Sequence, residues 1–250
     1  MKILRTRGET LFEEYLGLRG LRFDHEPNIG RRRPDYFVHS PAGDVLCEVK
    51  DFKPNDKDRA LSAAIAKKEI NVQWGPLQFA RIQLRIRAAS RQLREFKGRY
   101  PCLVVLCDPF ALASLSDLTV FGAMYGAVYL SVPIDADGTS RREPTNAFDR
   151  KTRYLTRDAN TTVSAVAILE RVTPNQRLVN EAVAKEHFEQ GSEGTRAKMK
   201  FIYDFADSNP EVFHEEPRLQ IFRNPFAALP WPDAALAGPH DTLWPNAATK

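Results

Sequence analysis

One apolar run, residues 101–109 (PCLVVLCDP), limits the fold more strongly than any other part of the chain. The run has the length of a strand, and because positions 102–107 are all apolar, both faces of that strand need cover. Just before it, residues 77–97 carry apolar side chains at steps of three and four, which predicts an amphipathic helix ending ahead of Gly98. A doubly covered strand beside such a helix predicts a layered α/β protein.

The N-terminal part of the chain predicts one helix followed by three strands. Residues 9–19 have apolar positions near helical spacing, and Gly20 provides a C-terminal stop. Three short segments rich in apolar, β-branched and aromatic residues follow, separated by turn sequences: residues 21–27, 34–40 and 44–52. We expect these three segments to pair as an antiparallel meander.

The second half of the chain predicts further strands, one helix and a tail. The expected segments are strands within residues 127–133, 161–170 and 219–230, a polar loop over 134–160, a helix over 173–190 and a Pro-rich tail over 226–250. The tail carries Trp231 and Trp244, which look exposed. The predicted fold class is α/β, a mixed sheet flanked by helices with additional C-terminal α+β elements, in one domain spanning residues 1–250.

Composition excludes several classes of protein. Apolar residues make up 43% of the chain, and no window approaches the ~18 apolar residues of a membrane span, so we expect no membrane protein. The basic N-terminus lacks a long apolar segment, which predicts no secretory signal and a cytoplasmic location. The widely spaced Cys47, Cys102 and Cys107 predict buried, reduced thiols rather than a disulfide framework or a zinc site.

Basic residues are clustered along the chain. The net charge of +4 names no partner by itself. Arg31, Arg32 and Arg33 form a run, five arginines fall on the helix predicted over residues 77–97, and six basic residues fall in the predicted polar loop. These clusters are either solvated surface charges or a contact surface for a polyanion such as nucleic acid.

Charged residues of the second and third predicted strands are placed to form one cluster. Glu48 and Lys50 point to the same face, because side chains alternate along a strand. If the two strands pair as a hairpin, Asp35 at the start of one lies close to the end of the other. Two simpler interpretations compete: Pro34-Asp35 as an ordinary turn, and Glu48 with Lys50 as a weak surface ion pair. The apolar neighbours of Glu48 favour a metal or lysine partner, because an unpaired carboxylate there is costly.

Two carboxylates and an ammonium suit a hard divalent cation and phosphoryl chemistry. Mg²⁺ prefers octahedral oxygen ligands at about 2.1 Å, which carboxylates, a backbone carbonyl and waters supply. A lysine beside the ion can orient a water and stabilise charge on a transferring phosphoryl group. The sequence has no histidine pair at metal spacing, no nucleophile elbow and no Gly-rich phosphate loop, which argues against zinc, acyl-transfer and NTPase chemistry.

The residues around this cluster resemble a known superfamily. Residues 32–38 (RRPDYFV), followed by residues 45–50 (VLCEVK), look like the motif of the PD-(D/E)xK nucleases, which have the restriction-endonuclease-like fold. The resemblance covers residues 8–110, including the helices before and after the motif. It implies a restriction-endonuclease-like mixed sheet, with a catalytic core in residues 1–110 and further strands and a helix completing the sheet in residues 111–225.

The same resemblance implies a role for each residue of the cluster. Asp35 and Glu48 would bind Mg²⁺, for which Mn²⁺ can substitute, with the Val49 carbonyl as a further ligand. Lys50 would orient the attacking water. Glu9 on the first helix would be an auxiliary carboxylate, with Glu13 as the second candidate for that role. The resemblance and the basic run together imply a set of nucleic-acid contacts: Arg31, Arg32, Arg33, Gln83, Arg87 and Gln92.

The leading hypothesis is therefore a Mg²⁺-dependent endo- or exonuclease that hydrolyses phosphodiester bonds of nucleic acid, with DNA expected rather than RNA. The alternative is a non-catalytic nucleic-acid-binding or assembly protein that keeps the nuclease-like fold. The unfamiliar C-terminal half, with its exposed-looking aromatic residues, favours this alternative. A homodimer, or a partner protein bound through that half, stays open, as does an RNA substrate.

Overall fold

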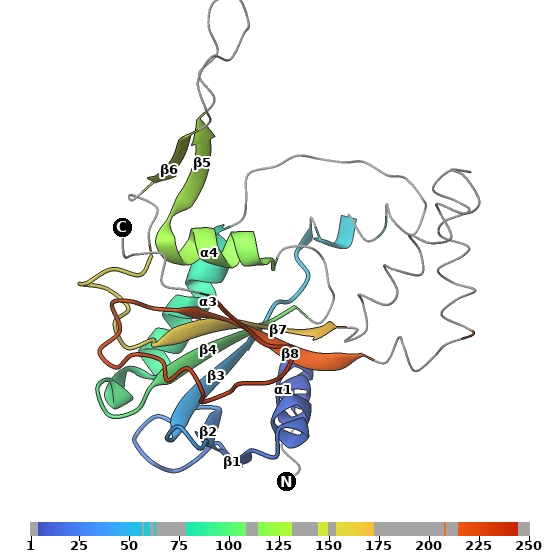
Figure 1. The fold of residues 1–250 in the computed structure, drawn as a ribbon, viewed down its shortest axis with the longest axis vertical. Helices are drawn as coiled ribbons and strands as arrows, with labels where there is room; N and C mark the ends of the chain where they lie inside the picture. The colour runs from blue at the N-terminus through green and yellow to red at the C-terminus, as the bar shows by residue number, and fades with distance from the viewer. Residues whose placement is uncertain are drawn as a thin grey trace, which may run out of the picture. The chain divides into compact units, whose positions relative to one another are not determined.

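The computed structural model describes residues 5–56, 58–60, 63, 79–108, 115–131, 145–149, 154–172, 208 and 215–244. Figure 1 shows its helices and strands, which are α1 (Arg7–Leu18), β1 (Arg22–His25), β2 (Tyr36–His39), β3 (Val45–Asp51), α3 (Phe79–Gln92), the 3-10 helix η1 (Arg94–Phe96), β4 (Cys102–Cys107), α4 (Asp117–Tyr125), β5 (Ala127–Ser131), β6 (Thr145–Asp149), β7 (Ala165–Val172), β8 (Glu216–Arg223) and β9 (Thr242–Trp244). The helix predicted over residues 173–190 lies outside the described residues.

Seven strands form one mixed sheet in the order β1-β2-β3-β4-β7-β8-β9. β1, β2 and β3 pair antiparallel, which confirms the predicted meander. β3, β4 and β7 pair in parallel, as do β8 and β9. β5 and β6 form a separate antiparallel pair. The predicted fold class, a mixed α/β sheet flanked by helices, is confirmed.

β4 is an inner strand of the sheet, and all of its residues are buried. Leu103 and Val105 belong to the cluster that contains Phe12 of α1. Val104 and Leu106 belong to the cluster formed with α3 and α4. Helices therefore cover both faces of the inner strands, as the ribbon in Figure 1 shows. This double burial explains why the run of residues 102–107 contains no polar position.

α1 begins two residues before its predicted start, at a capping box. The Thr6 hydroxyl accepts the backbone N–H of Glu9 at 3.2 Å, and the Glu9 carboxylate accepts the backbone N–H of Thr6 at 2.7 Å. The two bonds satisfy donors that a helix start otherwise leaves unpaired. Gly20, with φ +62°, follows the helix and supplies the left-handed conformation of its C-terminal turn.

The helix predicted over residues 77–97 is α-helical from Phe79 to Gln92 and then tightens into η1. Its predicted apolar stripe is confirmed at Ile82, Ile86 and Ala89, which are buried against the sheet. The predicted end before Gly98 is also confirmed, because that glycine has φ +75°.

Two elements differ from the sequence-based expectation. α4 was not predicted, and six of its nine residues are buried. A helix that is buried over most of its surface has no clear polar face, so its sequence lacks the amphipathic period that identifies a helix. The polar loop predicted over residues 134–160 is wrong at residues 145–149, because these form β6 against β5.

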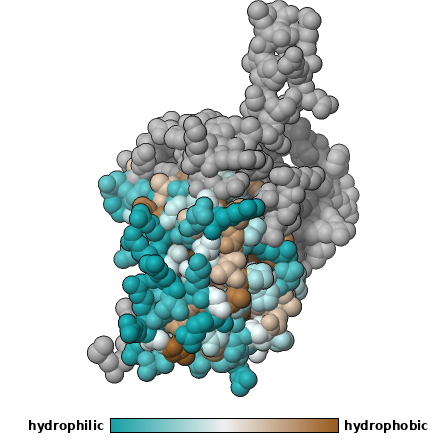
Figure 2. Space-filling model, turned by 90° about the vertical axis from the view of Figure 1, so that its left-hand side faces the viewer, coloured by the Kyte–Doolittle hydropathy of each residue, from teal (hydrophilic) through white to brown (hydrophobic). Residues whose placement is uncertain are grey.

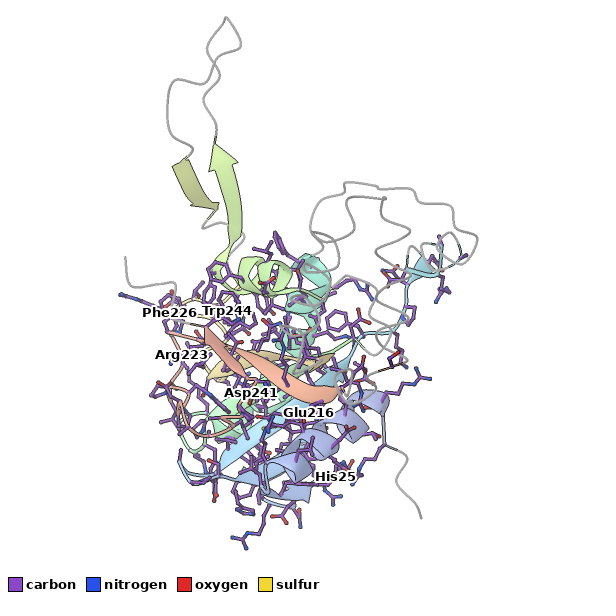
Figure 3. The ribbon with its side chains drawn as sticks, turned by 45° about the vertical axis from the view of Figure 1, so that its right-hand side comes forward. His25, Glu216, Arg223, Phe226, Asp241 and Trp244 are labelled. Atoms are coloured by element: carbon purple, nitrogen blue, oxygen red, sulfur yellow. The ribbon has the colours of Figure 1, made fainter. Side chains whose placement is uncertain are left out.

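The expectation that Trp231 and Trp244 of the Pro-rich tail are exposed is wrong. Trp231 is 4% exposed and belongs, with Leu236, to the cluster that contains α1. Trp244 is half-buried in β9, where its ring stacks on Phe222 with centroids 5.6 Å apart. Trp244 and Phe226, both labelled in Figure 3, pack against the cluster on the α3 side. Burial of aromatic surface thus holds this segment on the sheet.

The chain divides into two compact units, Met1–Leu169 with Leu219–Lys250, and Glu170–Arg218. In the second unit the structure describes little beyond the ends of β7 and β8, where Arg218 binds Glu170 at 2.7 Å. The single domain of residues 1–250 stays a prediction.

The three cysteines are free and buried, as predicted. Among the described residues, none of the helices has both the length and the apolar character that crossing a membrane requires. The cytoplasmic location stays a prediction.

Two glycines of α1 provide a matched test of this packing. A Cβ atom at Gly8 would lie 1.9 Å from Asp51 Oδ1 and 3.0 Å from the Cys107 Cβ atom, whereas one at Gly17 would meet nothing within 4 Å. Gly8→Ala is expected to lower the free energy of unfolding by about 1–3 kcal/mol through overpacking. Gly17→Ala is expected to raise it by about 0.5–1 kcal/mol through helix propensity. Urea unfolding followed by circular dichroism measures both, and equal effects of the two changes would contradict the packing of α1 on β3 and β4.

Candidate functional site

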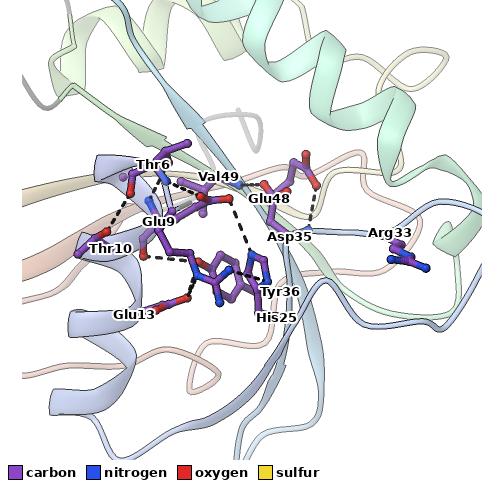
Figure 4. A network of polar contacts seen from close by, with 12 residues as sticks. Thr6, Glu9, Thr10, Glu13, His25, Arg33, Asp35, Tyr36, Glu48 and Val49 are labelled. Atoms are coloured by element: carbon purple, nitrogen blue, oxygen red, sulfur yellow. Dashed lines mark hydrogen bonds and ion pairs between the residues drawn. The ribbon is translucent and has the colours of Figure 1, made fainter. Parts of the chain in front are cut away.

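The pairing of β2 with β3 brings Asp35 and Glu48 together. Tyr36 lies opposite Cys47 in the register. Asp35, which precedes Tyr36, therefore lies opposite Glu48, which follows Cys47. The backbone N–H of Asp35 donates to Glu48 Oε2 at 3.3 Å, and the backbone N–H of Val49 donates to Asp35 Oδ2 at 2.8 Å. Figure 4 shows both contacts. Each carboxylate is therefore held by the backbone of the other strand.

Lys50 completes this cluster. Its ammonium donates to Glu48 Oε1 and lies 4.0 Å from Asp35 Oδ2. The side chain of Glu48 is fully buried, whereas those of Asp35 and Lys50 are 18% and 19% exposed. One edge of the cluster therefore reaches solvent while its inner carboxylate does not.

Two carboxylates and one ammonium leave an excess negative charge in a mostly buried place. Burial, the charge of Asp35 and the opposing effect of Lys50 together raise the pKa of Glu48 to about 8. Burial also raises the pKa of Asp35, against the lowering effects of Lys50 and the Val49 N–H. A bound cation would relieve this excess charge, which is the electrostatic condition of a metal site.

The two glutamates of α1 that were expected as candidates, Glu9 and Glu13, have different surroundings. Glu9 caps the helix through Thr6 and lies 4.0 Å from His25 Nε2. Its charge contributes to the raised pKa of Asp35, so it is an electrostatic neighbour of the cluster. Glu13 binds Arg5 at 2.6 Å and accepts the Tyr36 hydroxyl at 3.1 Å instead. Of the two candidates for an auxiliary carboxylate, Glu9 is therefore the better placed.

The expected grouping of three acidic side chains around one ion is not assembled. Among the described residues, no three acidic, histidine or cysteine side chains lie close enough together to hold a metal. Glu9 does not join Asp35 and Glu48 because its capping bonds hold it at the start of α1. The donor set at β2 and β3 is thus two carboxylates with the Val49 carbonyl nearby. This set still fits Mg²⁺, because that ion commonly keeps several waters and takes one or two protein carboxylates.

The basic run lies against the C-terminal end of α3. Backbone N–H groups of Arg31 and Arg32 donate to the Glu95 carboxylate, and the Arg32 guanidinium donates to the Arg91 carbonyl. Gln92 Nε2 donates to the Arg33 carbonyl at 3.2 Å. These contacts fix the backbone of the run while its three side chains stay exposed.

The other predicted nucleic-acid contacts are separated along α3. Gln83 Nε2 donates to the Ala123 carbonyl of α4 at 3.2 Å, so this amide serves helix packing. Arg87 is exposed and borders a cavity whose far wall is formed by residues 154–162.

Several residues beside the cluster were not predicted from the sequence to take part. Asp51 Oδ2 accepts the Gly8 N–H at 3.2 Å, and its buried Oδ1 has no hydrogen-bond partner. Arg5 Nη1 lies 2.9 Å from His25 Nδ1, and His25 Nε2 lies 4.0 Å from Glu9. In the sequence, Asp51 follows directly after Glu48-Val49-Lys50. This position was the signal that could have predicted a carboxylate of Asp51 beside the cluster.

Comparison with known proteins gives little further information. No protein-family model matches the chain, and no curated protein matches it. Among solved structures, Pyrococcus furiosus SfsA in complex with Ca²⁺ matches with 18% sequence identity and a TM-score of 0.23. That match covers 54% of this chain and 59% of the SfsA chain. Similarity of this degree shows neither a shared family nor a shared function.

The raised pKa of Glu48 predicts how stability depends on pH. A carboxyl whose pKa rises from 4.5 to about 8 on folding favours the folded state at low pH, and this contribution is lost as pH rises between those values. Glu48→Gln removes the charge, so at pH 8 it should raise the free energy of unfolding by more than about 1 kcal/mol. At pH 4.5 it should have little effect.

Thermal unfolding of both proteins in EDTA, over this pH range, measures the difference. Asp44→Asn, an exposed change just before the same strand, is the control. A destabilised Glu48→Gln protein at pH 8 would show that the Glu48 charge is fully compensated in the fold.

Proposed function

We propose that the chain is a metal-dependent nuclease that hydrolyses phosphodiester bonds of nucleic acid. The observation that carries this proposal is the contact of Asp35, the fully buried Glu48 and Lys50 at the adjoining ends of β2 and β3. Two adjoining carboxylates whose pKa values are both raised by burial are typical of functional sites, and this supports the proposal. The resemblance of this motif to the PD-(D/E)xK nucleases supports the same function.

Each residue of the cluster has a chemical task under this proposal. Hydrolysis joins a water oxygen to phosphorus and breaks one ester P–O bond, and the leaving oxygen gains a proton. Asp35 and Glu48, with the Val49 carbonyl, would hold Mg²⁺ or Mn²⁺, which lowers the pKa of bound water and neutralises phosphoryl charge. Lys50 lies at the solvent-facing edge, where its ammonium would orient the water and stabilise charge on the phosphoryl oxygens.

The exposed arginines would hold the substrate. Arg31, Arg32 and Arg33 directly precede Pro34-Asp35, so phosphates bound by this run would lie near the cluster. Contacts of this kind bind any sequence, because phosphates carry no base information. We propose DNA as the substrate, with RNA as the other arm of the test.

The second candidate is a nucleic-acid-binding protein that does not cut. The position of Glu9, held in its capping box and away from a third ligand position, favours this candidate. Both candidates share the basic run and differ only in cleavage.

Cleavage of plasmid DNA, single-stranded DNA and RNA in Mg²⁺, Mn²⁺ or EDTA separates them. The proposal expects metal-dependent cleavage that falls by about 100-fold or more in Asp35→Asn and in Lys50→Gln, because each change removes a charge that acts on the transition state. Asp44→Asn, at the other end of the same hairpin, should keep the parent rate. Circular dichroism establishes that the variants fold. Full activity in either cluster variant would overturn the assigned roles, and a salt-sensitive mobility shift without cutting would favour the second candidate.

Metal binding has a readout that does not depend on activity. Mg²⁺ or Mn²⁺ should raise the melting temperature of the chain at pH 8, because a ligand that binds only the folded state stabilises it. The shift should vanish in Glu48→Gln and persist in Asp44→Asn. An equal shift in all three proteins would place the metal elsewhere.

A further inference from the structure

The basic residues of α3 and of the segment that follows it up to Lys97 fall into two groups. Arg81 binds Asp58 at 2.9 Å and the Lys53 carbonyl at 2.8 Å, and Arg85 lies over the Phe52 ring at 5.9 Å. These two N-terminal arginines are therefore occupied within the protein.

The second group lies at the C-terminal end of α3 and beyond it. It consists of Arg87, Arg91, Arg94 and Lys97, all exposed. Within the described part of the chain, none of these four cationic side chains forms an ion pair. Four like charges on one short stretch repel one another, so an anion bound among them would be stabilised.

These four side chains line one cavity. The cavity has a volume of about 470 Å³ and lies between α3 with η1 and residues 154–162. Its remaining polar lining includes the hydroxyls of Ser90, Thr161 and Thr162, and Asp158 is its only acidic residue. The lining therefore carries three positive charges in excess. Its volume falls in the range of small-ligand sites, and a mononucleotide is of this size.

The wall opposite α3 is fixed in place. Asn224, which is 3% exposed, donates to the Val163 carbonyl at 2.7 Å and to the Asn160 carbonyl at 3.3 Å. The backbone N–H of Ala228 donates to the Thr161 carbonyl at 2.7 Å. Asn160 has φ +58°, a left-handed conformation that asparagine tolerates better than most residues, and it shapes the turn of this wall. A wall held in this way loses little entropy when a ligand binds.

We infer that this cavity binds the phosphate group of a nucleotide, with Arg87, Arg91, Arg94 and Lys97 as its cationic ligands. Guanidinium groups match the geometry of phosphate oxygens and form charge-assisted hydrogen bonds with them. Ser90 on α3, with Thr161 and Thr162 on the opposite wall, can supply further hydroxyl donors, and the half-buried Tyr154 ring offers a surface for a base. The anion site follows from the cavity itself, whereas the nucleotide identity rests on the proposed nuclease function.

The nucleotide has two sources, the end of a nucleic-acid strand and a free mononucleotide. Fluorescence anisotropy in EDTA, where no metal-dependent cleavage occurs, separates them. The probes are a short single-stranded DNA with a phosphate at its 5′ end, the same strand with a 3′ phosphate, and the strand with neither. AMP and inorganic phosphate serve as competitors.

The strand-end source predicts that one phosphorylated strand binds about tenfold more tightly than the unphosphorylated one, as expected for one set of charge-assisted bonds. The free-nucleotide source predicts instead that AMP binds the chain directly and that the three strands bind alike. In either case Arg87→Ala combined with Arg94→Ala should remove the effect, and Arg22→Ala, an exposed arginine on β1, should leave it.

The inference is overturned if the three strands bind alike and AMP does not bind, or if the double variant keeps the preference. Because the assay needs no cleavage, its outcome is independent of the nuclease test. Phosphate-dependent binding without cleavage would support the phosphate site and contradict the proposed nuclease activity. Cleavage without a phosphate preference would support the nuclease activity and contradict the phosphate site.

Discussion

The parallel pairing of β3 with β4 is the constraint from which the candidate site follows. Each residue of β3 from Leu46 to Asp51 has a partner in β4, and Glu48 lies beside Val104. β4 is buried on both faces, so its neighbour carries a carboxylate into a place where water is excluded. Lys50 and the Asp35 N–H lie within reach and offset only part of the cost of burying this charge, so the pKa of Glu48 stays raised.

The cluster reaches solvent at one edge, where the side chains of Asp35 and Lys50 are partly exposed. Figure 2 shows hydrophilic side chains over most of the described surface on one face of the molecule. The core is assembled away from this surface, in the two layers that α1 on one side and α3 with α4 on the other form on the inner strands. Site and stability are therefore divided between different residues of the same strands, since Val45 and Cys47 pack while Glu48 and Lys50 carry charge.

Sequence patterns predicted those features of the fold that depend on segments close together in the chain. The β2–β3 hairpin placed Asp35 near Glu48 because the two strands are joined by a short turn, and α3 was visible in its stripe from Ile82 to Ala89. α4 was missed because burial on most sides removes the amphipathic pattern. The burial of Trp231 and the contact of Glu95 with the arginine run join segments far apart in sequence, and no local pattern reports such contacts.

Glu9 illustrates how two interactions compete for one side chain. The spacing Thr6-x-x-Glu9 is itself the sequence signature of a capping box, and the structure contains both of its bonds. A cap of this kind contributes on the order of 1 kcal/mol, which is small beside the attraction between a carboxylate and a divalent ion in a partly buried site. Since Glu9 already acts electrostatically on Asp35, an ion held by Asp35 and Glu48 would draw the Glu9 carboxylate away from Thr6. Without such an ion, the capping box keeps Glu9 at the start of α1, so among the described residues only the carboxylates of Asp35 and Glu48 meet where β2 and β3 adjoin.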